Sequence, residues 1–351
     1  MNIAFWKNAA LHSFRLLTMR SQAGGSEDLE ETRGKKDERT RTSPLESSID
    51  IIPPAPDNSP KKKRDEKMEE GATRGGQWKG TAYGQRLSDD DLGNLCEKLK
   101  NSMEAAGMKG FEGFVPMAVV MAVARQMEAS LELNTLKKEV EESETSEEEE
   151  DNGEDNGIRK KRVKIRTLSG EVAQLPEASK ELQNNFKGHR SAIQMLYDEG
   201  RDHYVVVYYS RSQHCIRFYD SFIETGPQKW RTIKPMASQI RILFGHLFNN
   251  ESIPVTLVQD FEQQDDEWSC GYRAIAAIIN LAARRDPGGS EVDLRSIHNL
   301  LKEALTREMT WKDFKDWRLT KRDADFGLTE MHYIIHPNLR MERVSKDGSP
   351  S

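Results

Sequence analysis

The sequence contains few cysteines and no long apolar run. Its 351 residues include three cysteines, Cys96, Cys215 and Cys270, without a CxxC pair or zinc-ligand spacing. This odd number argues against a disulfide framework and suits a reducing compartment. A membrane span needs roughly 18 apolar residues, and the nearest candidate, residues 114–124, is too short. We therefore expect neither a disulfide-rich secreted domain nor a membrane partner.

Apolar residues are also scarce for a chain of this length. Hydrophobic residues make up 36% and charged residues 31% of the sequence, so one core that includes the whole chain is not expected. A folded part of roughly 200 residues with disordered segments fits this composition better. Residues 1–80 are rich in charge, serine and proline and lack sustained periodicity. They predict a long disordered N-terminal region.

Three short signals lie inside residues 1–80. An isolated apolar tetrad that could add an edge strand to a small β-rich partner consists of Ile49, Asp50, Ile51 and Ile52. A basic cluster typical of a nuclear import signal consists of Lys61, Lys62, Lys63 and Arg64. Residues 1–26 contain basic residues but no acid, as a mitochondrial presequence does, or they form an untargeted terminus. We expect a nuclear location, with the cytoplasm or the mitochondrion as alternatives.

Two charged blocks of opposite sign follow each other in the middle of the chain. Residues 139–155 contain 11 acids and no base, and residues 159–166 contain six bases in eight positions. Neither block can pack in a core, so residues 139–170 predict a charged linker or insertion. Because the basic block has no interleaved aromatic residues, base stacking is unsupported and nucleic-acid binding is not expected.

The remaining segments predict an α+β domain. Ser88 can cap a helix whose leucines recur at helical spacing, and a second helix is expected near Pro116, so residues 81–138 form a helical N-terminal part. Strands are predicted at residues 193–196, 204–209, 216–219 and 253–258, followed by helices over residues 270–283 and after Asp293. Helices before and after a run of strands indicate an α+β core over residues 171–320, with residues 321–351 as a C-terminal tail.

A cysteine stands at the predicted start of the apolar helix from residue 270. The first-turn N–H groups and the helix dipole favour thiolate over thiol, so Cys270 is the candidate nucleophile, with a buried structural thiol as the alternative. His203 opens one predicted strand and Asp220 closes the next, supplying a base and a group to orient it. Gln264, six residues before the cysteine, could donate to an oxyanion, and so could Gln263.

The order His203, Asp220, Gln264 and Cys270-Gly271 resembles the Ulp1/adenain-type cysteine proteases, which include SUMO-specific and other ubiquitin-like-protein-specific proteases and their viral and mobile-element relatives. The resemblance extends from about residue 87 to about residue 317 and is specific over residues 203–280. It implies a papain-like or adenain-like fold with a central mixed sheet and flanking helices. It also implies a thiol (iso)peptidase that cleaves after the C-terminal Gly-Gly of SUMO or another ubiquitin-like protein, without metal or cofactor. The oxyanion role then belongs to Gln264 by the spacing of the family.

The resemblance also implies a narrow aromatic channel for the Gly-Gly tail, lined by Tyr204 and Trp268. Three positions depart from the family pattern: Tyr204 replaces a common Trp, Ser269 a common Asp, and Arg273 an apolar residue. These departures leave the choice of substrate open. Beside such a domain, the apolar tetrad at residues 49–52 resembles a SUMO-interaction motif.

The departures also leave three other functions open. One is a catalytically weak or inactive module that binds a ubiquitin-like protein, which predicts affinity without release of product. The second is a mobile-element-derived peptide protease, which predicts cleavage of peptides that lack a Gly-Gly end. The third is an acyltransferase that uses the same Cys-His arrangement. Turnover and substrate type distinguish these alternatives from one another.

Overall fold

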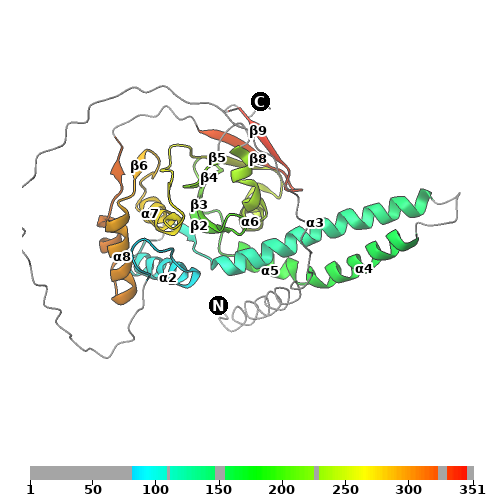
Figure 1. The fold of residues 1–351 in the computed structure, drawn as a ribbon, viewed down its shortest axis with the longest axis horizontal. Coiled ribbons are helices and arrows are strands. Elements are labelled where there is room, and N and C mark those ends of the chain that lie inside the picture. Colours follow the sequence, from blue (N-terminus) through cyan, green and yellow to red (C-terminus); the bar gives the residue numbers. More distant parts are fainter. Residues whose placement is uncertain (1–80, 109–110, 147–154, 225–228, 323–329, 346–351) are drawn as a thin grey trace, which may run out of the picture. The chain divides into compact units, whose positions relative to one another are not determined.

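A computed structural model of the protein describes residues 81–108, 111–146, 155–224, 229–322 and 330–345. The predicted disordered region, with its apolar tetrad, its basic cluster and its possible presequence, lies outside these residues. In the described part the fold is α+β, with a mixed seven-stranded sheet and flanking helices (Figure 1). None of the helices in these ranges is long and apolar enough to cross a membrane.

The sheet has the strand order β1-β2-β3-β4-β5-β8-β9. Its strands are β1 (Phe111–Gly113), β2 (Ser191–Asp198), β3 (His203–Ser210), β4 (Cys215–Tyr219), β5 (Ile253–Leu257), β8 (Met331–Ile335) and β9 (Met341–Val344). β1 is parallel to β2 and β4 is parallel to β5, and the other neighbours are antiparallel. Because β3 and β4 are antiparallel, the first residue of β3 and the residue after β4 lie at the same end of the sheet.

Helices cover both faces of this sheet (Figure 1). One face packs on α2 (Asp89–Ala105), α7 (Cys270–Ala282), α8 (Leu294–Thr306) and α9 (Trp311–Asp316). The other packs on α3 (Met117–Ser146), α5 (Leu175–Gln183) and α6 (Ala237–Phe244). Side chains of β3 alternate between the two cores: Val206 joins the first, and Val205 and Val207 join the second. All of α7 is buried, which explains why its sequence is apolar on every side.

The local signals for helix starts and strands agree with these elements. The Ser88 side chain accepts a hydrogen bond from the Asp91 N–H at 3.1 Å, so it caps α2 as expected. α3 begins directly after Pro116, and the Asp293 side chain caps α8. Shorter elements complete the described chain: β6 (Ser290–Glu291), β7 (Thr320–Lys321), and the 3₁₀ turns Lys229–Thr232, Lys234–Met236 and Gly245–Phe248. The strands and helices of the predicted core are all present, with ends that differ by at most two residues.

The charged middle segment, for which a charged linker or insertion was expected over residues 139–170, is helical in its described part. α3 continues into the acidic block, and α4 (Asp155–Glu171) contains the basic block. Lys161 pairs with Glu139 at 3.1 Å, and Lys164 pairs with Glu132 at 2.5 Å. Opposite charges on two neighbouring helices therefore stabilise an inserted helical pair that needs little apolar surface of its own.

Part of the C-terminal segment 321–351, which was expected to be a tail, forms two strands of the sheet within residues 330–345. β8 pairs with β5 over five residues, from Ile253 opposite Ile335 to Leu257 opposite Met331, and β9 pairs with β8. Tyr333 and Ile335 are buried in the second core. A five-residue strand that pairs with a partner some 75 residues away leaves no local signal, because its stability comes from that non-local pairing.

Candidate active site

Cys270 is the first residue of the buried helix α7, and its side chain is only 1% exposed. The turn before it is fixed by Asp266, whose Oδ1 accepts hydrogen bonds from the backbone N–H groups of Trp268 at 3.0 Å and Ser269 at 2.7 Å. The carboxylate therefore satisfies two N–H groups of the turn that leads into the helix. The turn holds the thiol in one place at the positive end of the helix dipole.

The structure brings His203 and Asp220 to this thiol. His203 Nε2 donates to Asp220 Oδ1 at 2.7 Å, and both side chains are buried. The His203 ring also interacts with the Cys270 side chain, so that each group shifts the pKa of the other. Since Nε2 is engaged by the carboxylate, Nδ1 is the ring nitrogen left for the thiol. Two neighbouring strands and the central helix thus bring together a carboxylate, an imidazole and a thiol, with a hydrogen bond between the first two.

The surroundings of Cys270 favour the charged forms of both reacting groups. Burial acts to raise the pKa of the Cys270 thiol, but hydrogen bonds from His203 and the Tyr204 backbone N–H, together with the charges of His203 and Arg86, lower it overall. Burial acts to lower the pKa of His203, but its hydrogen bonds to Asp220 and Cys270 raise it to about 9. The directions of both pKa shifts therefore favour a thiolate–imidazolium pair over the neutral pair.

The other two cysteines lie in environments that keep the thiol protonated. Burial raises the pKa of Cys96 to about 12. Burial also raises the pKa of Cys215, which lies at the start of β4 and donates weakly to Gln213 at 3.8 Å. Because the thiolate is the nucleophilic form, chemical reactivity should separate Cys270 from both of them.

We expect iodoacetamide at pH 7 to alkylate Cys270 faster than Cys215, because the thiolate is the reacting form and the pKa is lowered at Cys270 and raised at Cys215. His203→Ala should abolish this advantage, since burial then dominates the pKa of Cys270. Mass spectrometry that resolves each site measures the alkylation rates of all three cysteines in one sample, at pH 6, 7 and 8. Faster labelling of Cys215 than of Cys270 at every pH would contradict the assignment of a lowered thiol pKa.

Arg201 is a further residue of this site that the sequence did not reveal. Its Nη2 donates to Asp220 Oδ2 at 2.9 Å, and its Nε pairs with Asp198. Its Nη1 donates to the carbonyl oxygen of Phe222 at 2.7 Å. Arg201 thereby fixes the orientation of the carboxylate that holds His203. An arginine in a turn between strands has no distinguishing sequence signal, because such residues are usually solvated.

The two neighbouring glutamines differ in what their amide groups bind. Gln263 Nε2 donates to the carbonyls of Asp220 at 3.0 Å and Phe261 at 2.9 Å, so both of its hydrogens are used. Gln264 Oε1 accepts from Ser221 Oγ at 2.8 Å, and its Nε2 donates to the Asp266 carbonyl at 2.8 Å. An amide nitrogen carries two hydrogens, so Gln264 keeps one available for a ligand. Hydrogen bonding therefore favours Gln264 over Gln263 as an oxyanion donor.

Tyr204 and Trp268, which were expected to line a channel for the substrate, have different surroundings. The Tyr204 hydroxyl donates to Asp89 at the start of α2, and its buried ring lies beneath the Arg86 guanidinium at 5.4 Å. Trp268 is half-buried and packs edge-on against Tyr83, with ring centres 5.3 Å apart. Arg86, which lies over the Tyr204 ring and whose charge helps to lower the pKa of Cys270, was not foreseen.

The segment before α2 lies directly on the start of α7. A Cβ at Gly271 would be 3.3 Å from Cβ of Leu87, closer than most such contacts. Glycine after the cysteine is therefore what lets the two segments approach. Arg86 is held over this contact by an ion pair with Asp202 at 2.5 Å.

The departures at Ser269 and Arg273 compensate each other. Arg273 Nε donates to Ser269 Oγ at 3.0 Å, and Ser269 Oγ donates to Asp266 Oδ2 at 2.8 Å. Arg273 Nη1 also pairs with Glu262 at 2.5 Å. A buried arginine on α7 thus receives a carboxylate and a hydroxyl as partners, which such a charge requires. The network braces the loop that carries Gln264 and Asp266 and removes no reacting group.

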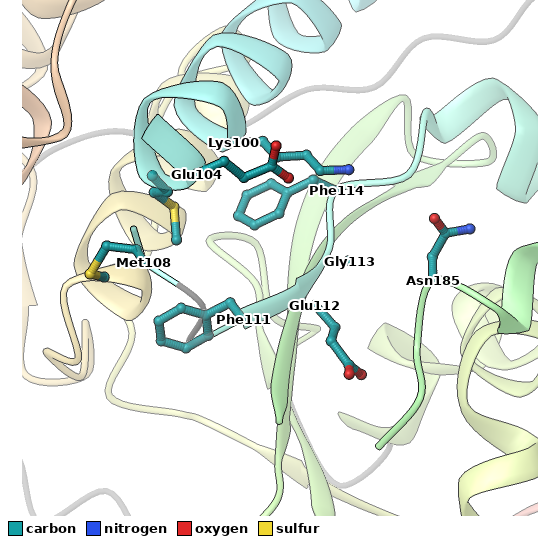
Figure 2. A pocket seen from close by; sticks show the side chains of 9 residues that line it. Lys100, Glu104, Met108, Phe111, Glu112, Gly113, Phe114 and Asn185 are labelled. Carbon is teal, nitrogen blue, oxygen red and sulfur yellow. The ribbon is translucent and has the colours of Figure 1, made fainter. Parts of the chain in front are cut away.

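Two hollows in the described surface lie away from the thiol. The first has a volume of about 190 Å³, and its lining includes Lys100 and Glu104 of α2 and Phe111 of β1 (Figure 2). The second, of about 440 Å³, is lined by residues from the other ends of β3 and α7. Neither includes a residue of the Cys270 site. Over the described ranges, no group of three or more His, Cys, Asp or Glu side chains could hold a metal ion.

No protein-family model matches the chain, and no curated protein matches its sequence. Functional assignment therefore depends on the geometry of the site. A thiolate held by an imidazolium, beside a helix N-terminus and an available amide N–H, can attack a carbonyl carbon and stabilise the resulting oxyanion. Acyl transfer is the chemistry for which these four groups are suited.

Proposed function

We propose that the protein is a cysteine-type (iso)peptidase that cleaves after the C-terminal Gly-Gly of a ubiquitin-like modifier, with SUMO as the first candidate. The observation that carries the proposal is the placement of the buried Cys270 thiol at the start of α7 with His203, whose Nε2 donates to the buried Asp220 carboxylate at 2.7 Å. In this setting the pKa of the Cys270 thiol is lowered, whereas those of Cys96 and Cys215 are raised. The fold is then of the papain-like or adenain-like type, with the cysteine at the start of the central helix and the base on the sheet.

In the proposed reaction the Cys270 thiolate attacks the carbonyl carbon of the last glycine. The oxyanion receives hydrogen bonds from the Cys270 backbone N–H and Gln264 Nε2. The C–N bond then breaks, and the leaving amine takes its proton from His203, which leaves a thioester on Cys270. Water attacks the thioester while His203 accepts a water proton, and the departing thiolate restores the ion pair.

The enclosure of the thiol supports a slender substrate. With Cys270 only 1% exposed and Tyr204 buried beside it, little space remains around the sulfur. A chain without side chains can enter such a channel, and a branched residue at the scissile carbonyl meets a steric penalty. Two glycines at the end of a ubiquitin-like protein satisfy this requirement.

Covalent capture tests the proposal. The full-length protein is incubated with SUMO, NEDD8 and ubiquitin that each carry a C-terminal propargylamide, and peptide mapping locates the adduct. A thioether on Cys270 with one of the three modifiers is the expected result. No adduct with any modifier overturns the proposal. Affinity without an adduct then favours a binding module, and cleavage of peptides without Gly-Gly favours a peptide protease.

We expect Gln264→Ala to lower kcat by about 10²–10³-fold, the usual loss for one oxyanion donor. Gln263→Ala is the matched control, because its amide hydrogens are already used by backbone carbonyls. It should change thermal stability more than the rate per folded enzyme. Both variants are assayed with the captured modifier carrying an aminomethylcoumarin amide at its C-terminus, whose hydrolysis rate is measured. An equal rate loss in the two variants would contradict the role of Gln264 as an oxyanion donor.

A further inference from the structure

Phe222 presents an exposed aromatic ring beside the base. Its side chain is 53% exposed, and its ring centre is 6.1 Å from that of His203. Burial of a phenylalanine ring stabilises a fold, and an exposed ring at this position forgoes much of that gain. An exposed apolar side chain beside the proposed base indicates a binding surface more strongly than one elsewhere on the protein does.

The backbone around Phe222 is held by side chains. The Phe222 N–H donates to Asp220 Oδ1 at 2.7 Å, and its carbonyl accepts from Arg201 at 2.7 Å. The next two N–H groups donate to Gln263 Oε1 at 2.7 Å and Thr232 Oγ1 at 2.9 Å. The ring is therefore displayed on a fixed backbone, and its outward position is not that of a loose loop.

The position of this ring relates it to the leaving group. The base that protonates the leaving amine must touch that amine, so the leaving group lies against His203. Phe222 is the exposed apolar neighbour of the same imidazole. The successive N–H groups from residue 222 to 224 and the Phe222 carbonyl are already bonded within the protein. The surface beside His203 thus offers the apolar ring of Phe222, and none of these three N–H groups is available to a ligand.

From this we infer that Phe222 forms a leaving-group subsite selective for the aliphatic stem of a lysine, so that the enzyme prefers isopeptide bonds to α-peptide bonds. Four methylene groups next to the departing nitrogen can pack on the ring, as lysine stems do on apolar surfaces. An α-linked leaving group instead places a polar backbone there and leaves it without partners. The inference rests on the proposed function and extends it to removal of modifiers from lysines.

Two substrates that share an acyl part test this subsite. The modifier captured by the propargylamide is joined to one short peptide either through a lysine ε-amine or through the peptide's α-amine. The full-length enzyme should cleave the isopeptide with a kcat/KM at least about tenfold higher. Phe222→Ala should lower isopeptide cleavage by about tenfold, the effect of losing one apolar contact, and largely remove the preference. Phe222→Leu should retain most of it.

Controls separate this subsite from other roles of the ring. Val163→Ala removes another exposed apolar side chain, on α4, and should leave both rates unchanged. Propargylamide capture has no amine leaving group, so Phe222→Ala should alter it less than about twofold, well below a single lost contact. An equal fall in capture and in both cleavage rates, with a shifted pH profile, would assign Phe222 to positioning His203 and overturn the inference. Equal cleavage of both substrates by the wild type would also overturn it, whereas failure of capture overturns the proposed function itself.

Discussion

Cys270→Ala is expected to reduce the hydrolysis of a Gly-Gly substrate by about 10⁶-fold, the order of loss that follows removal of a triad nucleophile. Without the sulfur no thioester can form, and the remaining oxyanion donors act only on direct attack by water. The side chain is buried at the start of a helix. Alanine is smaller and has a high helix propensity, so the fold should persist. Hydrolysis of the aminomethylcoumarin amide and propargylamide capture measure the loss.

Cys215→Ala is the matched control for this variant. It removes a free thiol on β4, whose pKa burial raises, and should leave the rate unchanged. Cys270→Ala should also still bind the modifier with an affinity close to that of the wild type, because the substrate contacts remain. Residual turnover above about 1% of the wild-type rate would contradict the nucleophilic role, since a triad without its nucleophile retains far less.

Asp220→Asn is expected to lower kcat by roughly 10²–10⁴-fold, because the carboxylate both orients His203 and stabilises its charged form. The same change acts on pH dependence. Asp220 contributes to the raised pKa of His203, about 9, and the imidazolium is needed to protonate the leaving amine. In the wild type, activity should therefore fall as pH rises through about 9. Without the carboxylate the pKa of His203 decreases, and this alkaline limb should move to lower pH.

Asp202→Asn is the control variant that separates the effect of the Asp220–His203 hydrogen bond from the effect of removing a carboxylate charge near His203. This acid precedes His203 in the chain, but its oxygens bind Arg86 and Tyr197, and its side chain is exposed. It should change kcat less than about tenfold, as expected for an exposed ion pair. Rate–pH profiles of both variants provide the measurement. Equal losses, or an alkaline limb that stays in place in Asp220→Asn, would remove Asp220 from its orienting role.

Several local features of the fold could be predicted because neighbouring residues specify them. Ser88 and Asp293 start helices through their own side-chain caps. The apolar runs of β2, β3 and β4 have the residue types of buried strands, and they pair in chain order. The strands β8 and β9 were missed because each is short and gains its stability from a partner distant in the chain. The helical form of the charged blocks was missed because charge indicates solvation and says little about helix formation.

The sequence by itself determined the order of reacting groups and the elements that carry them: a histidine at a strand start, an acid at the end of the next, and a cysteine at a helix start. Only the tertiary structure decided which polar groups already have hydrogen-bond partners within the protein. It distinguished Gln264 from Gln263, linked Ser269 to Arg273, and showed Arg201 behind Asp220. The physical reason is that residue type states what a side chain can bond, whereas burial and non-local packing decide what it does bond.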